Sequence, residues 1–441
     1  MLQTHIEKTT DRWAQGLAHA QFDAVWIAAG NDHLHFQDDH GPVFKPHPFF
    51  TQFVDPTYAH AGAQCLVRPG QKPQLFLLQP TDYWHAVSPL PEYLNDWVDL
   101  HVFSDQSSLD KACRDAVQPN ERCAFVGEVL NKDTDNELLG TPNDERLLAY
   151  MSFHRARKTE YELQAMRIAS EVGVRGHIAA EEAFRAGKTE FDIHMAYLAA
   201  SSQTDLELPY GNIVALNEHG ATLHYQLNDR QPPAQHRSLL IDAGGEHLGY
   251  ASDITRTYAM DTESSFANLI DLMQSHQDAI LAEVSPSRTF ASLHVFMHEN
   301  LARVLESANL ITCSAEDALE MGITEKFCPH GLGHLLGIQV HDVGGHLANE
   351  DGDAAPPPDN YPTLRFTRQI ETDQVFTIEP GIYFIDSMIK SLRDDNAPIN
   401  WQTLEALYPY GGVRIEDNVR VLEQGHENLT RDAWQRVTAN G

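Results

Sequence analysis

Apolar and polar positions alternate differently in two parts of the chain, and this change predicts two domains. In the first third, short apolar runs are separated by polar or helix-like connections, which predicts strands at 22–29, 74–78, 97–103 and 123–127. Strands that alternate with helices are typical of an α/β domain. Because no G-x-G-x-x-G follows any of these runs, nucleotide binding there is not supported.

The change in pattern comes near residues 153–158. Directly after it, Thr159 and Glu162 have the spacing of a helix capping box, and a long stretch with helical periodicity follows until Gly187. Further helices are predicted at 189–200, 266–284 and 290–308, and strands at 213–216, 238–245, 254–258, 375–384 and 412–422. We therefore predict an α/β N-terminal domain over residues 1–155 and an α+β domain over residues 156–441.

The composition limits the classes of binding partner and the cellular compartment that we expect. The chain has 63 acidic and 31 basic residues, a formal net charge of −32 that repels phosphate backbones and anionic lipid. We therefore expect neither nucleic acid nor a membrane as a partner. Residues 1–8 are polar and do not have the apolar core of a signal peptide. The five cysteines form no C-x-x-C pair and are expected to be reduced, so we predict a cytoplasmic protein.

Two aspartates lie at the ends of predicted strands in the second part of the chain. Asp242 ends the apolar run 239–241, and Asp253 comes directly before the β-rich segment 254–258. The two strands of a hairpin would bring these side chains together. Two carboxylates in an apolar sheet are strongly disfavoured unless they are protonated or held by a cation. Taken alone, the pair is compatible with a structural role or a surface position as well as with cation binding.

Three further residues favour cation binding. Glu379 and Glu416 also end apolar strands, and His334 lies in the glycine-rich segment 331–337, which allows close backbone approach. Four such carboxylates would be too costly together without cations, and their charge balances two divalent ions. The oxygen-rich set with one imidazole predicts two divalent metal ions per subunit, with Mn²⁺ as the expected metal. A water bridging the two ions would have a lowered pKa and act as the nucleophile.

Four segments around these residues, 241–257, 329–334, 377–381 and 414–417, resemble the pita-bread metallopeptidases, which have the creatinase/methionine aminopeptidase-like fold. Segments 82–85, 209–218 and 339–345 are similar to a subgroup of that family, the bacterial prolidases (Xaa-Pro dipeptidases) and organophosphorus acid anhydrolases. The likeness covers nearly the whole chain. One position departs from the pattern: Leu335 stands where these enzymes usually have a second histidine, which changes the surroundings of His334 but keeps the ligand.

The resemblance implies a homodimeric enzyme that hydrolyses dipeptides with a C-terminal proline and releases proline. Asp242 would chelate one ion, Asp253 and Glu416 would bridge both, and His334 and Glu379 would complete the other. Glu379 would also accept the proton of the attacking water.

The resemblance also assigns the substrate contacts. His330 would stabilise the charge that develops at the scissile carbonyl. The free carboxylate of the dipeptide would be held by His224, His341 and Arg414. Tyr210 and Phe290 would line small pockets, although both are as compatible with core packing.

Alternative functions stay open at this point. An aminopeptidase P-like enzyme would remove the N-terminal residue from longer Xaa-Pro peptides. A binding protein that has lost catalysis would show neutral residues at some ligand positions, whereas all five ligands are present. A pair of metal ions can also attack P–F and P–O bonds, so organophosphate hydrolysis is expected as a side activity or as the main one.

Overall fold

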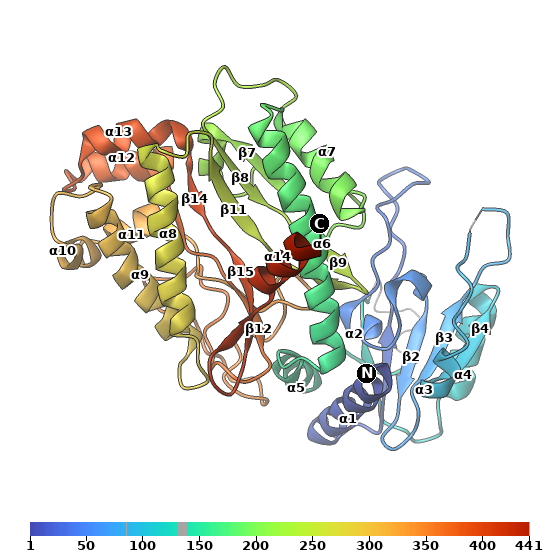
Figure 1. Ribbon diagram of the computed structural model, residues 1–441. Coiled ribbons are helices and arrows are strands. Elements are labelled where there is room, and N and C mark those ends of the chain that lie inside the picture. The colour runs from blue at the N-terminus through green and yellow to red at the C-terminus, as the bar shows by residue number, and fades with distance from the viewer. Residues whose placement is uncertain (85, 130–138, 441) are drawn as a thin grey trace. The chain divides into compact units, whose positions relative to one another are not determined.

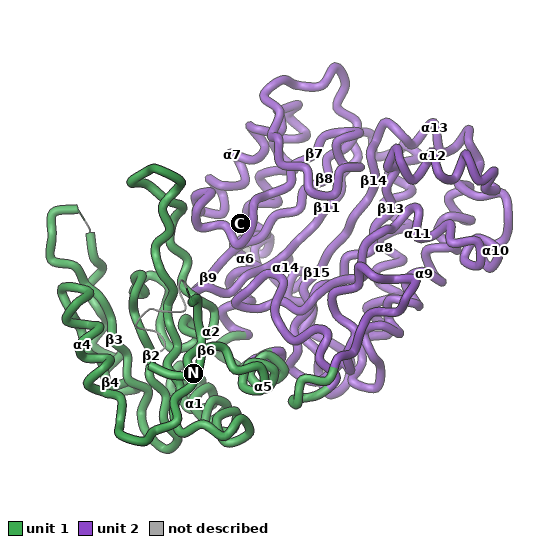
Figure 2. Tube along the Cα trace, turned by 180° about the vertical axis from the view of Figure 1, so that it is seen from behind, with its two compact units in different colours: residues 1–155, 159–162, 349–353 green, residues 156–158, 163–348, 354–441 purple. Residues whose placement is uncertain are grey.

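The computed structural model describes residues 1–84, 86–129 and 139–440, which form two compact units (Figure 2). Unit 1 consists of Met1–Arg155, Thr159–Glu162 and Asn349–Asp353, and unit 2 of Ala156–Lys158, Leu163–Ala348 and Ala354–Gly441. The predicted domain limits fall where the two units alternate along the chain, and they stay a prediction. His85, part of one segment that carries the resemblance, lies outside the described residues.

Unit 1 is built on a mixed six-stranded sheet, which confirms the α/β prediction. Its strands follow the order β4-β3-β2-β1-β5-β6, and β1 runs antiparallel to β2 but parallel to β5. The strands are β1 (Ala24–Ala28), β2 (Gln64–Val67), β3 (Gln74–Leu78), β4 (Asp99–Phe103), β5 (Cys123–Val126) and β6 (Thr141–Pro142). The helices are α1 (Leu2–Ala20), α2 (Pro48–Thr51), η1 (Pro56–Tyr58), α3 (Leu94–Trp97), α4 (Gln106–Ala116) and α5 (Glu145–Arg155).

Unit 2 is α+β, as predicted. Its helices are α6 (Glu160–Arg185, with its first turn in unit 1), α7 (Glu190–Ser201), η3 (Asn217–Ala221), α8 (Ser265–Ala282), α9 (Phe290–Ser307), α10 (Ala315–Glu320), α11 (Ile323–Phe327), α12 (Asp386–Asp394), α13 (Trp401–Leu407), η4 (Tyr408–Tyr410) and α14 (Leu429–Asn440). Its strands are β7 (Ile213–Leu216), β8 (Ser238–Asp242), β9 (Glu246–His247), β10 (Tyr250–Ala251), β11 (Thr255–Ala259), β12 (Val375–Ile378), β13 (Gly381–Tyr383), β14 (Gly412–Arg414), β15 (Asp417–Val421) and β16 (His426–Asn428). Among the helices of the described residues, none combines the length and apolar character needed to cross a membrane.

Helices α6 and α7 both begin with a capping box. The Thr159 N–H donates to Glu162 Oε2 at 2.7 Å, and the Glu162 N–H donates to Thr159 Oγ1 at 3.4 Å. Thr189 and Asp192 make the same reciprocal pair at the start of α7. These bonds satisfy backbone donors that have no partner inside a helix, which is why the sequence signal placed both helix starts correctly.

Two helix pairs flank the strands of unit 2 on opposite sides (Figure 1). Apolar residues of α6 and α7 pack with β7 and β8 in one buried cluster, and those of α8 and α9 pack with β12 to β15 in another. The strands between them end close together. Asp242 at the end of β8 pairs with Thr255, Thr255 forms a bridge with Glu416, and Gly381 of β13 pairs with Arg414. This pairing gathers the polar residues that follow each strand.

Candidate metal centre and active site

The five predicted ligands line one cavity of about 320 Å³ in unit 2. Each comes from the end of a strand or from a segment paired with one: Asp242 ends β8, Asp253 precedes β11, Glu379 follows β12, Glu416 lies between β14 and β15, and His334 is adjacent to Leu335, which bridges to Phe376 of β12. The same cavity wall includes His224, His330, His341, Arg365 and Arg414.

His334 lies among three of the predicted carboxylate ligands. Asp253, His334 and Glu416 each offer an atom within 4.8 Å of the others. His334 Nε2 lies 3.4 Å from Asp253 Oδ2 and 3.8 Å from Glu379 Oε1. The His334 Nδ1–H donates to the carbonyl of Leu335 at 3.0 Å, which turns Nε2 toward the carboxylates. The side chain of Leu335 is buried in the apolar cluster.

Asp242 and Asp253 share a hydroxyl and differ in their other partners. Tyr210 Oη lies 2.8 Å from Asp242 Oδ1 and 2.5 Å from Asp253 Oδ1, and its single proton can serve only one of them at a time. Arg414 Nη2 donates to Asp242 Oδ2 at 2.7 Å. Asn418 fixes the backbone of Asp253, because its Oδ1 accepts from the Asp253 N–H at 2.9 Å.

Burial makes the carboxylate set electrostatically costly. It raises the pKa of Asp242 and raises that of Glu379 to about 7. The pKa of Glu416 lies well above its ordinary value, because burial is joined by the negative charges of Asp253, Glu379 and Asp242. Burial also acts to raise the pKa of Asp253, but the hydrogen bond and charge of His334 lower it overall. The set as a whole therefore needs added positive charge.

These residues fit divalent cations. Arg414 and Arg365 together bring two positive charges to a cavity that holds four carboxylates, and Arg414 is ion-paired with Asp242. Carboxylates buried without full compensation are expensive, and divalent ions would supply the missing charge. Carboxylate oxygens with a single imidazole suit hard divalent metals better than a thiolate-based zinc site would.

A hydrogen-bond chain connects Arg414 to His330. Arg414 Nη1 donates to the Tyr383 hydroxyl oxygen at 3.0 Å, and the same hydroxyl lies 2.8 Å from His330 Nε2. His330 Nδ1 lies 2.7 Å from the Gly331 carbonyl, which can only accept, so Nδ1 carries a proton and Nε2 accepts from Tyr383. Burial, with the charge of Arg414, lowers the pKa of His330 to about 4, which keeps the ring neutral.

The other residues that were predicted to contact the substrate lie in different surroundings. His224 and His341 line the cavity, and the His341 ring meets His334 edge-on at a centroid distance of 4.4 Å. Tyr210 contacts the predicted ligands through its hydroxyl. Phe290 belongs to the core, because it is fully buried and packs against Phe366 with a centroid distance of 4.5 Å.

Sequence reasoning missed three residues that hold the site together. Tyr383 links Arg414 to His330. Thr255 Oγ1 donates to Glu416 Oε2 at 2.7 Å and accepts from Arg414 Nε at 3.1 Å. Asn418 holds Asp253. All three lie within four residues of a predicted ligand, so their closeness to a ligand in the sequence could have pointed to them.

A profile of metallopeptidase family M24 matches residues 164–423, well over half of the chain. The chain belongs to metallopeptidase family M24. Residues 1–153 match a profile described as the Xaa-Pro dipeptidase N-terminal domain. The chain is 40% identical to Xaa-Pro dipeptidase 2 of Idiomarina loihiensis, over 99% of this chain and 98% of that protein. It is 42% identical to the Xaa-Pro dipeptidase of Shewanella loihica, over 97% of each chain. The predicted family is therefore confirmed, and the protein is a metal-dependent hydrolase.

Solved structures share the fold at low sequence identity. The aminopeptidase PepP of Pseudomonas aeruginosa aligns with a TM-score of 0.74 and 21% identity over all of both chains. A zinc-substituted E. coli aminopeptidase P in complex with product aligns with a TM-score of 0.74 and 20% identity, over 98% of this chain and 97% of that one. This likeness confirms the predicted fold class, an α/β N-terminal domain followed by a pita-bread catalytic domain.

Proposed function

We propose that this member of family M24 hydrolyses Xaa-Pro dipeptides and uses two divalent ions, with Mn²⁺ as the expected metal. The observation that carries the proposal is the shared cavity, where the five predicted ligands lie beside His224, His341 and Arg414, the residues predicted to bind the substrate carboxylate. Relatives that are 40% and 42% identical over nearly the whole chain are named Xaa-Pro dipeptidases, which supports the same substrate.

In this proposal the five ligands divide between the two ions. Asp242 would hold one ion, Asp253 and Glu416 would contribute to holding both, and His334 with Glu379 would hold the other. When bound, the ions polarise the scissile carbonyl and lower the pKa of the attacking water. The oxygen-rich donor set favours Mn²⁺ over metals that prefer thiolates.

The protein's own side chains would orient the substrate and move protons. Glu379 faces the cavity and would take the proton of the attacking water. His330 would face the scissile carbonyl, with its ring held by the bond from Tyr383 to Nε2. To stabilise charge on the carbonyl oxygen, its Nδ1–H would have to pass from the Gly331 carbonyl to the substrate. Arg414, with His224 and His341, would bind the free carboxylate of the dipeptide. Tyr210 contacts Asp242 and Asp253 through its hydroxyl and would act through these two ligands.

The substrate is tested with chelated protein that is reloaded with Mn²⁺. We expect chelation to abolish turnover, and Mn²⁺ to restore cleavage of Ala-Pro and Gly-Pro. A tripeptide with proline second should be cleaved at least about tenfold more slowly, because its carboxylate lies one residue too far from Arg414. Full activity in verified metal-free protein contradicts the metal proposal. Equal rates on the tripeptide would favour the aminopeptidase P-like alternative.

We also propose a cytoplasmic homodimer. The five cysteines are free, and four of them are buried, as suits a reducing compartment. In unit 1, Phe36 and Trp84 are 91% and 75% exposed, and such exposed aromatic side chains are enriched at protein interfaces. Sedimentation should show a species of twice the chain mass. A monomer at micromolar concentration, or recovery of the chain outside the cytoplasmic fraction, contradicts the respective proposal.

A further inference from the structure

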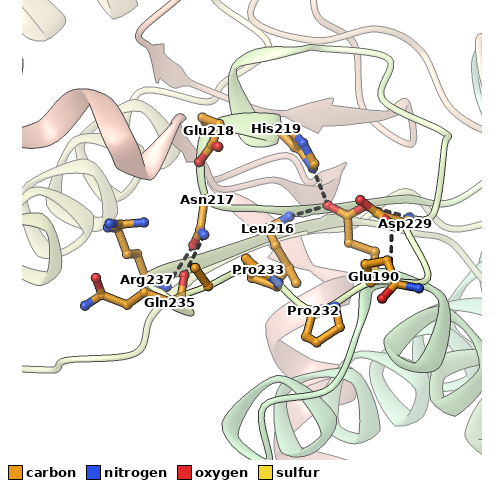
Figure 3. A pocket seen from close by; sticks show the side chains of 12 residues that line it. Glu190, Leu216, Asn217, Glu218, His219, Asp229, Pro232, Pro233, Gln235 and Arg237 are labelled. Carbon is orange, nitrogen blue, oxygen red and sulfur yellow. Dashed lines mark hydrogen bonds and ion pairs between the residues drawn. The ribbon is translucent and has the colours of Figure 1, made fainter.

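One buried carboxylate outside the candidate active site holds a chain segment at both of its ends (Figure 3). Glu190 is 1% exposed and accepts four hydrogen bonds. Its Oε1 accepts from the Leu216 N–H at 2.9 Å and from His219 Nδ1 at 2.7 Å. Its Oε2 accepts from the Tyr225 hydroxyl at 2.7 Å and from the Asp229 N–H at 2.8 Å. The carboxylate is thus fully satisfied although it is buried.

The four donors lie on both sides, along the chain, of a residue that lines the substrate cavity. They span residues 216–229, in the connection between β7 and β8. Leu223 and His224 lie within this span and line the active-site cavity. Leu216 and His219 precede them, and Tyr225 and Asp229 follow, so one carboxylate fixes the segment on both sides of His224.

The local structure makes this carboxylate an efficient anchor. Glu190 is the first residue of α7, where the positive end of the helix dipole stabilises a negative charge. A cavity of about 310 Å³ lies beside it, lined on its other side by residues such as Gln235 and Arg237 (Figure 3). Because side chains cannot pack across a cavity, hydrogen bonds carry more of the ordering of this segment.

Tyr225 connects the anchor to the active site. Its hydroxyl donates to Glu190, and its ring stacks on His219 at a centroid distance of 4.5 Å. The same side chain packs in a buried cluster that includes Tyr383, the residue that links Arg414 to His330. The position of Tyr225, and of His224 next to it, therefore depends on both Glu190 and the wall of the site.

We propose that Glu190 is a positioning residue that sets where His224 stands in the substrate cavity. The inference rests on the proposed role of His224 in holding the substrate carboxylate. Among the described residues, Glu190 is not one that lines the substrate cavity, and its four hydrogen bonds all come from residues 216–229, so it acts through the segment it holds. Loss of its hydrogen bonds would let His224 sample other positions and weaken substrate binding.

The test replaces Glu190 by Gln, which keeps the shape but turns a donor group toward N–H and hydroxyl donors. In Mn²⁺-loaded protein we expect the KM for Ala-Pro to rise about 5- to 20-fold, with kcat within about twofold of wild type. Amides 217–229 should exchange hydrogen faster, while those of β8 keep their protection. Tyr225→Phe removes one donor only, and should give the same changes at a smaller size.

Two further variants separate positioning from a general loss of stability. In a His224→Ala background, Glu190→Gln should raise KM no further, because the residue through which it acts is gone. Asp192→Asn weakens the cap of the same helix and should lower the melting temperature without changing KM. An equal KM effect with and without His224 would overturn the proposal, as would an unchanged KM in folded Glu190→Gln.

The outcomes stay interpretable in two unfavourable cases. If Glu190→Gln does not fold, Tyr225→Phe decides by KM and by exchange, and wild-type values in both would overturn the proposal. If the wild-type protein does not cleave Xaa-Pro dipeptides, the proposed function fails. The exchange experiment still tests the anchor, since unchanged protection of amides 217–229 in Glu190→Gln would show that this carboxylate does not order the segment.

Discussion

Replacing Asp253 by Ala is expected to leave clearly fewer than two metal ions per chain and to lower kcat for Ala-Pro by roughly three orders of magnitude. Asp253 Oδ2 lies 3.4 Å from His334 Nε2, and Asp253, His334 and Glu416 each offer an atom within 4.8 Å of the others, so its loss removes a donor that both proposed ions need. Elemental analysis of protein dialysed against Mn²⁺, together with turnover measurements, checks both parts.

Thermal unfolding is a second measurement that tests metal binding by Asp253→Ala. Ligands that bind only the folded state raise its stability, so Mn²⁺ should raise the melting temperature of wild-type protein more than that of Asp253→Ala. Asp205→Ala is a matched control, because it removes a carboxylate from unit 2 that is largely exposed and pairs with His194. That control should keep two ions and normal turnover. Two tightly held ions in Asp253→Ala, with normal kcat, would refute the bridging assignment.

Local signals in the sequence located helices α6 to α9 and the strands around the candidate site, whereas short strands such as β2 and several other helices, among them α1 and α14, were not predicted. The capping boxes at Thr159 and Thr189 located two helix starts, because a cap depends on residues three apart. Strand β2 (Gln64–Val67) was not predicted, since four residues without strong alternation carry little periodicity. It pairs antiparallel with both β1 and β3, and so contributes the antiparallel pairs of the mixed sheet.

The candidate site was predictable as a set of residue types but not as a set of contacts. An acid at the end of an apolar strand is visible in the sequence, as at Asp242 and Glu379. The hydrogen bond between Arg414 and Asp242 joins residues 172 positions apart, and that between Thr255 and Glu416 joins residues 161 apart. Such contacts depend on how β8, β11 and β14 pair, which no local pattern specifies.

Replacing Arg414 by Ala is expected to lower kcat/KM for Xaa-Pro dipeptides by roughly 30- to 150-fold. This corresponds to about 2–3 kcal/mol for a charge-assisted contact with the substrate carboxylate. The guanidinium donates through Nε to Thr255, through Nη1 to Tyr383 and through Nη2 to Asp242. Of its five N–H donors, two therefore remain for a carboxylate, one on each terminal nitrogen.

The contacts of Arg414 also determine the control. Because Arg414→Ala removes a partner of Asp242, metal content must be measured in the same preparation. An Xaa-Pro amide, which has no carboxylate, separates loss of the carboxylate contact from damage to the metal centre. Loss of the carboxylate contact should change the rate on the amide little. Damage to the metal centre should slow cleavage of the dipeptide and the amide equally. Arg414→Lys keeps the positive charge but not the planar guanidinium. Its kcat/KM for the dipeptide should therefore fall between those of the wild type and Arg414→Ala. If Arg414→Ala keeps both ions and cleaves the dipeptide and the amide at wild-type rates, Arg414 does not select dipeptides, and removal of residues from longer Xaa-Pro peptides becomes the better account.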